Sequence, residues 1–257
     1  MPPGPRRPAG FRSYALATEE NLFPELATSA RFEDVGKGRS GTVLVKADGT
    51  GAVPLVRSTT RYSTPAQHFR VAHERLAERI RERAALDVGF NNALIEIYTN
   101  ACTTMGSHSD QAVDLAEKSS IAVFSCYEHP GTDPPRKLIV EPKDSGGDHV
   151  EIPLTHHGVV VFSVDTNRRL KHRIVLDKTA GTAGNRWLGV TFRTSKTFVR
   201  FRDGHPYLPD GARLTSADDE QRGEFYRLRR RENNETDFTY PPLTYTVSES
   251  DLLPPVR

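Results

Sequence analysis

The chain has 257 residues, of which 36% are apolar and 26% charged, enough for one large globular domain. No apolar run is long enough to cross a bilayer, and no apolar stretch typical of a signal peptide follows Arg6 and Arg7. The two cysteines, Cys102 and Cys126, provide no disulfide framework, so a reducing cytoplasm is the expected location. The net charge of +2 does not by itself call for a nucleic-acid-binding face.

The first 62 residues carry weak structural signals. Residues 1–20 are rich in Pro, Gly and Arg, which predicts a flexible N-terminus. Residues 21–60 alternate short apolar pieces with Gly, which predicts short strands and loops. The polar, basic segment 56–62 is predicted to be a solvated loop, and the alternative is a loop that covers a substrate.

A helix is predicted over residues 65–87. Thr64 is a suitable N-cap, Pro65 suits the first helical position, and Gln67 completes a capping box. The apolar stripe of this helix is formed by Phe69, Leu76, Ile80 and Ala84. The charges fall mostly on the opposite face, which predicts a surface helix.

After Gly89 the apolar period becomes that of strands. Strands are predicted at 93–99, 120–127, 137–141, 150–154, 158–164, 171–176 and 187–193. Turn clusters separate them at 144–147, 156–158, 165–167 and 181–185. With the segment around His108 the count is about eight, the number in a double-sheet jelly roll. The predicted fold class is therefore mainly β with flanking helices (α+β), with the jelly-roll core at about 90–196.

The segment 201–257 is predicted to form a C-terminal helix and an extended tail packed on the core. Ser216 is the predicted cap of a helix that runs to about Arg231, with Phe225 and Leu228 facing inward. The arginines near its C-terminal end suit the negative end of the helix dipole.

A candidate metal site begins at His108 and Asp110. Residues two apart on a strand point to the same side, so this pair presents an imidazole and a carboxylate to one cavity. A second imidazole would complete the two-His, one-carboxylate set that non-haem Fe(II) oxygenases use, because it leaves positions open on the metal. The third ligand predicted here is His172, which follows the strand at 158–164 and a turn.

The remaining histidines are interpreted as ordinary polar residues. They lie in turns, in loops or on the predicted helix surface: His68, His73, His129, His149, His156, His157 and His205. Arg186 and Arg193 flank the last predicted strand, where an arginine beside a metal cavity can hold a carboxylate through two parallel hydrogen bonds.

The order of these segments resembles the AlkB-like family of Fe(II)/2-oxoglutarate-dependent dioxygenases. The resemblance is carried by residues 95–98, by His108 and Asp110, by 119–125, by 158–162, by His172 and by 186–193. It covers roughly residues 90–196 and implies a double-stranded β-helix within a dioxygenase domain at 21–200. It also implies Fe(II) bound by His108, Asp110 and His172, and O2 and 2-oxoglutarate as co-substrates.

The resemblance further implies that Tyr98 and Arg193 contact the carboxylates of 2-oxoglutarate. Three features depart from the family. Six residues rather than five separate Arg186 from Arg193, so strand alternation turns Arg186 away and leaves Trp187 or Gly189 facing inward unless a bulge intervenes. Glu96 stands where the family commonly has asparagine. No base-reading loop is recognisable at 57–62.

Three functions remain open. The resemblance implies hydroxylation, or demethylation through a hydroxymethyl intermediate, because Asp110 stands where related halogenases have a small residue. The expected substrate is small, such as a nucleoside, nucleotide or natural product. The first alternative is an oxidative demethylase of alkylated nucleic acid, whose basic segments at 57–61, 196–202 and 227–231 would follow phosphates. The second is a non-catalytic jelly-roll binding module with structural histidines. No membrane partner is expected, and the sequence does not indicate an oligomeric state.

Overall fold

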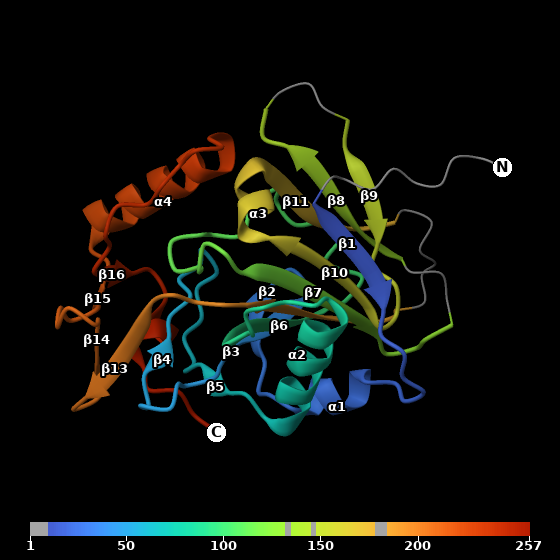
Figure 1. The fold of residues 1–257 in the computed structure, drawn as a ribbon, viewed down its shortest axis with the longest axis horizontal. Coiled ribbons are helices and arrows are strands. Elements are labelled where there is room, and N and C mark those ends of the chain that lie inside the picture. Colours follow the sequence, from blue (N-terminus) through green and yellow to red (C-terminus); the bar gives the residue numbers. More distant parts are fainter. Residues whose placement is uncertain (1–9, 132–134, 145–147, 178–183) are drawn as a thin grey trace.

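The computed structural model describes residues 10–131, 135–144, 148–177 and 184–257. Figure 1 shows two sheets that face each other, with helices α1 and α2 below the larger sheet and helix α4 at one side. Residues 1–9 and parts of the predicted turns at 144–147 and 181–185 lie outside the described residues. Among the described helices, none has the length and apolar character required to span a membrane.

The larger sheet has the strand order β1-β10-β7-β12-β6-β3-β2, and β5 pairs with β3 off this path. All its pairs are antiparallel except the β3–β5 pair. The strands are β1 (Phe11–Ala15), β2 (Glu33–Gly36), β3 (Arg39–Val45), β5 (Gln67–His68), β6 (Asn92–Tyr98), β7 (Ser120–Tyr127), β10 (Gly158–Ser163) and β12 (Trp187–Arg193). Strand β1 lies within residues 1–20, the stretch predicted to be flexible. These five residues are ordered as a strand because their backbone pairs with β10 and completes the edge of the sheet.

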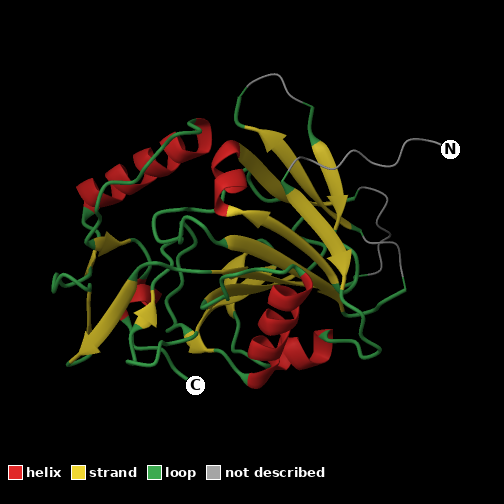
Figure 2. Ribbon diagram, in the orientation of Figure 1, coloured by secondary structure: helices red, strands yellow, loops and turns green. Residues whose placement is uncertain are grey.

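The smaller sheet has the order β11-β8-β9 and is also antiparallel. Its strands are β8 (Arg136–Pro142), β9 (Val150–Pro153) and β11 (Leu170–Leu176). Isolated bridges from Thr104 to Val175 and from His108 to His172 bring the segment before Asp110 to its edge. From β7 to β12 the chain passes repeatedly between the two sheets, so the predicted double-stranded β-helix is confirmed (Figure 2).

Alternate residues of the central strands enter two different cores, as the period of two requires. On β12, Leu188, Val190 and Phe192 pack in the cluster that contains the α2 side chains. Trp187 of the same strand packs between the two sheets with residues of β8, β9 and β11. The large sheet is therefore buried on both faces, and its inner face is available to form a site.

Two short helices cover the outer face of the large sheet: α1 (Phe23–Thr28) and α2 (Val71–Arg83). The predicted start of the second helix at residue 65 is wrong. The Gln67 amide bonds Arg31 and Thr42, and Thr64 donates to Glu33, so both residues are held by the N-terminal strands. The helix starts after Arg70 instead, where His73 closes a capping box.

His73 was expected on the helix surface, and this expectation is also wrong. Its ring is fully buried and lies 2.6 Å from Ser29 Oγ. The Arg70 N–H donates to its Nδ1, and burial lowers its pKa to about 4. A neutral imidazole therefore joins α2 to the end of α1.

The C-terminal segment packs beside the two sheets. Its regular elements are β13 (Phe198–Arg202), β14 (His205–Tyr207), β15 (Thr215–Ser216), α4 (Asp219–Asn234), β16 (Tyr245–Thr246) and a 3₁₀ helix (Glu249–Leu252). Strand β13 also pairs with β4 (Val53–Pro54) from the N-terminal part of the chain. Helix α4 is capped by Asp218 with Gln221, two residues later than predicted, because Ser216 is part of β15. Phe225 and Leu228 face inward as predicted.

The segment 56–62 is not the solvated loop that its composition predicts. The side chain of Arg57 is 4% exposed and bonds both carboxylate oxygens of Asp114, which is fully buried. Its Nη1 also donates to the carbonyls of Leu243 and Tyr245. Arg57 therefore joins this segment to the core and to the C-terminal tail.

Breaking this buried ion pair is expected to destabilise the protein strongly. Arg57→Met leaves the Asp114 carboxylate buried without its partner, which typically costs about 3–5 kcal/mol. Urea unfolding measures the loss. The matched control is Arg75→Met, because Arg75 pairs with Glu25 at the surface and exposed pairs contribute about 0–1 kcal/mol. Equal stabilities of the two variants would contradict the structural role of Arg57.

Candidate active site

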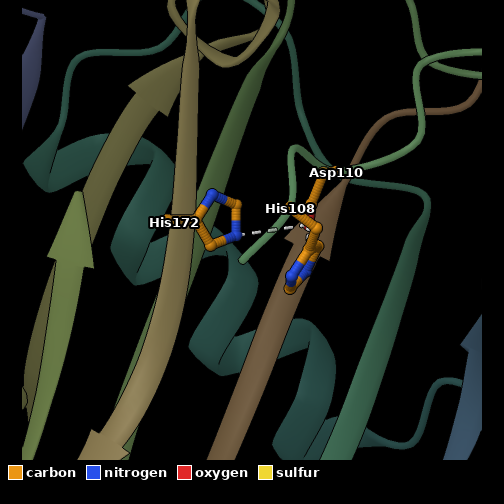
Figure 3. Close-up of side chains that lie close together, drawn as sticks. All are labelled: His108, Asp110 and His172. Atoms are coloured by element: carbon orange, nitrogen blue, oxygen red, sulfur yellow. Dashed lines mark ion pairs between the residues drawn. The ribbon is translucent and has the colours of Figure 1, made fainter. Parts of the chain in front are cut away.

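Three potential metal-binding side chains converge between the two sheets. One ligand atom from each of His108, Asp110 and His172 lies within 4.8 Å of the others. His172 comes from β11, and the other two residues come from the segment beside it (Figure 3). The two Nε2 atoms lie 3.8 Å (His108) and 3.6 Å (His172) from Asp110 Oδ1. The chain thus brings together the three residues that the sequence singled out.

The orientation of the two imidazoles suits a metal. Nδ1 of His108 is 2.7 Å from the carbonyl of Gly106, so a proton on Nδ1 leaves the Nε2 lone pair facing Asp110. The ring of His172 packs edge-on against Phe162, with ring centres 5.6 Å apart. The backbones of His108 and His172 exchange two hydrogen bonds of 2.7 and 2.9 Å, which keeps the rings adjacent.

The charge states also suit a metal. Burial, together with the neighbouring His172 ring, lowers the pKa of His108. Burial alone would raise the pKa of Asp110, but Arg193 and His172 hold it well below its usual value. At neutral pH the site therefore offers a neutral His108 imidazole and an ionised carboxylate, the protonation states that metal binding requires. Two nitrogens and one carboxylate oxygen fit Fe(II).

The backbone around Asp110 is held by side chains from other elements. Asn167 of α3 (Val164–Arg169) accepts from the Asp110 N–H at 2.7 Å and donates to the Asp110 carbonyl at 2.6 Å. Ser109 Oγ donates to the carbonyl of Leu170. A single carboxamide thereby fixes both backbone groups of the proposed carboxylate ligand.

Helix α4 holds the same segment from its other side. Asn233 accepts from the Ser109 N–H at 3.0 Å, and Glu232 accepts from the Ala112 N–H at 2.8 Å. Arg229 donates to the Ser109 carbonyl and pairs with Glu232 at 2.6 Å. The C-terminal helix therefore supports the segment that carries the candidate ligands His108 and Asp110 rather than only covering the core.

Removing one of these supports is expected to weaken metal binding. In Asn233→Ala the Ser109 N–H loses its acceptor beside Asp110, and the loss of such a supporting contact typically lowers metal affinity about tenfold to a hundredfold. Co(II) titration followed by visible absorption measures the affinity. Asn234→Ala is the control, because Asn234 is exposed and bonds only Arg230 of its own helix among the described contacts. Unchanged Co(II) affinity in Asn233→Ala would contradict the supporting role.

A cavity of about 100 Å³ opens beside the three residues. Its walls come from the large sheet, from β11, from residues 56–60 and from α4. The residues that line it include Arg39, Glu96, Tyr98, Gln111, Trp187, Gly189, Thr191, Arg193 and Arg229. Because residues 56–60 form part of the wall, the alternative interpretation of this loop as a cover agrees with its position.

The candidate 2-oxoglutarate contacts lie in different places. Tyr98 is 1% exposed, lines the cavity and donates to Glu96 at 3.1 Å. Arg193 lines the cavity, and its Nε donates to Asp110 Oδ2 at 2.8 Å. Arg186 instead forms a two-bond pair with Glu128, and its side chain is 48% exposed. The structure does not bring Arg186 to the cavity, because it precedes β12 and is an odd number of residues from Arg193.

Several buried polar atoms at the cavity have no hydrogen-bond partner among the described residues. They are Glu96 Oε1, both amide atoms of Gln111 and Trp187 Nε1. Buried polar groups are nearly always paired, so their concentration on residues of one cavity is typical of a functional site. Sequence reasoning missed Gln111, Asn167, Arg229 and Asn233, and only the position of Gln111 directly after Asp110 gave a signal.

Comparisons with known proteins add a likeness of fold. No protein-family model and no curated protein sequence matches the chain. Among solved structures, the chain is similar to a prolyl-4-hydroxylase of Pseudomonas putida, with a TM-score of 0.43 and 14% identity over 72% of this chain and 92% of that one. It is also similar to OsALKBH1, with a TM-score of 0.48 and 15% identity over 74% of this chain and 100% of that one. At such low identity, activity has to be inferred from the side chains of this chain.

Proposed function

We propose that this protein is an Fe(II)- and 2-oxoglutarate-dependent dioxygenase that hydroxylates, or oxidatively demethylates, a small substrate. The observation that carries the proposal is the convergence of His108, Asp110 and His172 within 4.8 Å beside an arginine-containing cavity. Nucleosides, nucleotides and natural products are the substrates considered.

The roles of the chain's own residues follow from their positions. His108, Asp110 and His172 hold Fe(II), and Arg193 keeps Asp110 ionised while facing the cavity. Arg193 and Tyr98 contact carboxylates of 2-oxoglutarate. Bound Fe(II) supplies the coupled oxidation in which O2 converts a C–H to C–OH while 2-oxoglutarate becomes succinate and CO2. Residues 56–60 cover the cavity and limit the access of water.

A succinate-release assay tests this function. Purified protein with Fe(II), 2-oxoglutarate and O2 is incubated with a panel that runs from nucleosides through nucleotides to methylated oligonucleotides. We expect succinate release that a small member of the panel stimulates and that omission of Fe(II) or of O2 abolishes. Release that is independent of Fe(II), or none with any panel member and none in its absence, would contradict the proposal.

Oxidative demethylation of nucleic acid is the alternative substrate assignment. Several arginines of the basic segments are paired internally: Arg57 with Asp114, Arg229 with Glu232 and Arg231 with Glu235. Paired arginines contribute less to a phosphate-binding surface, which supports the small substrate. Oligonucleotide binding that weakens steeply with salt would favour the nucleic-acid assignment.

The non-catalytic jelly-roll module is the remaining alternative. Structural histidines are expected to hydrogen-bond protein groups through both nitrogens, whereas the Nε2 atoms of His108 and His172 lie 3.8 and 3.6 Å from Asp110 Oδ1, beyond hydrogen-bond length. This arrangement supports the enzyme. A module without catalysis predicts no succinate in any condition of the assay.

A further inference from the structure

The cavity contains a cation that the family pattern does not predict. Arg39 of β3 pairs in register with Tyr98 of β6, which pairs in register with Trp187 of β12. Residues directly opposite each other on neighbouring strands share a face of the sheet. All three line the cavity, so Arg39 enters it from a strand two positions away from β12, about 10 Å from Trp187 between backbones.

Strand β12 itself has no second cation on this face. Its inward positions are Trp187, Gly189, Thr191 and Arg193. Trp187 takes the place of the family's first arginine, six positions before Arg193. A methyl group at Gly189 would lie 2.1 Å from the Trp187 ring, so the glycine makes room for the indole. The ring also packs edge-on against Tyr98, with ring centres 4.9 Å apart.

A buried dicarboxylate needs a cation at each end, because an unpaired buried charge is costly. Within the described part of the chain, the cavity is lined by four arginines: Arg39, Arg57, Arg193 and Arg229. Arg57 is paired with Asp114, and Arg229 is paired with Glu232 and donates to the Ser109 carbonyl. Arg193 lies at the metal end, bonded to Asp110.

Of the four arginines, Arg39 has the longest contact with its carboxylate partner. Its Nε is 3.6 Å from Glu96 Oε1, beyond hydrogen-bond length, and its side chain is 21% exposed. Glu96 itself is 7% exposed and accepts from Tyr98 at 3.1 Å. The presence of Arg39 also explains how a carboxylate is tolerated at position 96, where the family commonly has asparagine.

We infer that Arg39 binds the distal carboxylate of a 2-oxo dicarboxylic acid, with the 2-oxo acid end held at the metal and Arg193. The inference rests on the proposed function and deepens it by assigning the cation that β12 lacks. It makes Arg39 the residue that selects dicarboxylic over monocarboxylic 2-oxo acids. Glu96 competes with the ligand carboxylate for the same guanidinium.

Calorimetric titration of the Mn(II)-loaded protein without O2 tests the inference, with 2-oxoglutarate and 2-oxobutyrate as probes. The wild-type protein is expected to bind 2-oxoglutarate more tightly. Arg39→Met is expected to weaken 2-oxoglutarate binding about tenfold to a hundredfold, as for loss of a hydrogen bond to a charged group, and to leave 2-oxobutyrate binding unchanged. Arg39→Lys restores part of the preference. Arg200→Met, which removes an exposed arginine bonded to Thr50, leaves both affinities unchanged.

A second pair of variants separates ligand binding from folding. Glu96→Gln removes the competing carboxylate and is expected to tighten 2-oxoglutarate binding. Arg39→Met with Glu96→Gln leaves no unpaired buried charge, so it is expected to melt near the wild-type temperature and still lose the preference for 2-oxoglutarate. An equal loss of affinity for both probes would overturn the role of Arg39. So would an unchanged affinity for 2-oxoglutarate in the two variants that carry Arg39→Met. Failure of the wild-type protein to bind either probe would overturn the proposed function as well.

Discussion

His172→Ala is expected to abolish 2-oxoglutarate turnover while leaving the fold largely intact. The variant removes one of the two proposed nitrogen ligands and leaves His108 and Asp110 as the only two proposed ligands. Because loss of a supporting contact alone typically costs tenfold to a hundredfold in metal affinity, loss of a ligand should cost more than about a hundredfold. Succinate release and Co(II) titration measure the two effects separately.

The control for this variant is His149→Ala, because the side chain of His149 is 61% exposed and lies beside the exposed Glu151. Urea unfolding checks that His172→Ala remains folded, since its ring is 8% exposed and packs against Phe162. Full turnover in His172→Ala would remove His172 from the proposed metal site. Normal Co(II) affinity with lost turnover would assign it a role other than metal binding.

Arg193→Met is expected to raise the apparent KM for 2-oxoglutarate about tenfold to a hundredfold. A carboxylate bound in the cavity would lose a charged hydrogen-bond partner, which typically contributes about 1.5–3 kcal/mol. The same substitution removes the 2.8 Å contact with Asp110 Oδ2. Steady-state succinate release at varied 2-oxoglutarate measures the change, and Co(II) titration shows how much of it comes from Asp110.

Arg186→Met is the matched comparison for Arg193. Arg186 forms its two hydrogen bonds with Glu128 outside the cavity, so its loss is expected to leave the apparent KM unchanged. Arg193→Lys keeps the charge near Asp110 and loses the two-pronged geometry, so it should fall between wild type and Arg193→Met. An unchanged 2-oxoglutarate requirement in Arg193→Met would remove Arg193 from the proposed 2-oxoglutarate site.

The core strands were predictable because burial imposes an alternation that the sequence records directly. The predicted strands at 120–127 and 187–193 coincide with β7 and β12, and the other core strands agree within one residue at each end. His108 and Asp110 were predictable in the same way, because residues two apart on extended backbone point to the same side. The same alternation places Arg193 at the cavity and leaves Arg186 outside it.

Elements whose ends are set by distant partners were predicted less well. The start of α2 depends on Gln67 and Thr64, whose side chains bond residues 31–42. Arg57 was assigned to a solvated loop, because composition does not reveal a buried aspartate 57 residues away. In each case a specific long-range hydrogen bond outweighs a local propensity that is worth less than about 1 kcal/mol per residue.

The sequence by itself determined the core strands between residues 92 and 193, the opposite facing of Arg186 and Arg193, and the three residues that converge as a candidate metal site. Only the tertiary structure decided which side chains support that site, since Asn167, Asn233 and Arg39 come from elements outside the recognised motifs. Strand periodicity is a local property that each segment expresses alone. A row of side chains across neighbouring strands, or a side chain that accepts from a distant backbone N–H, exists only once segments far apart in the chain have packed together.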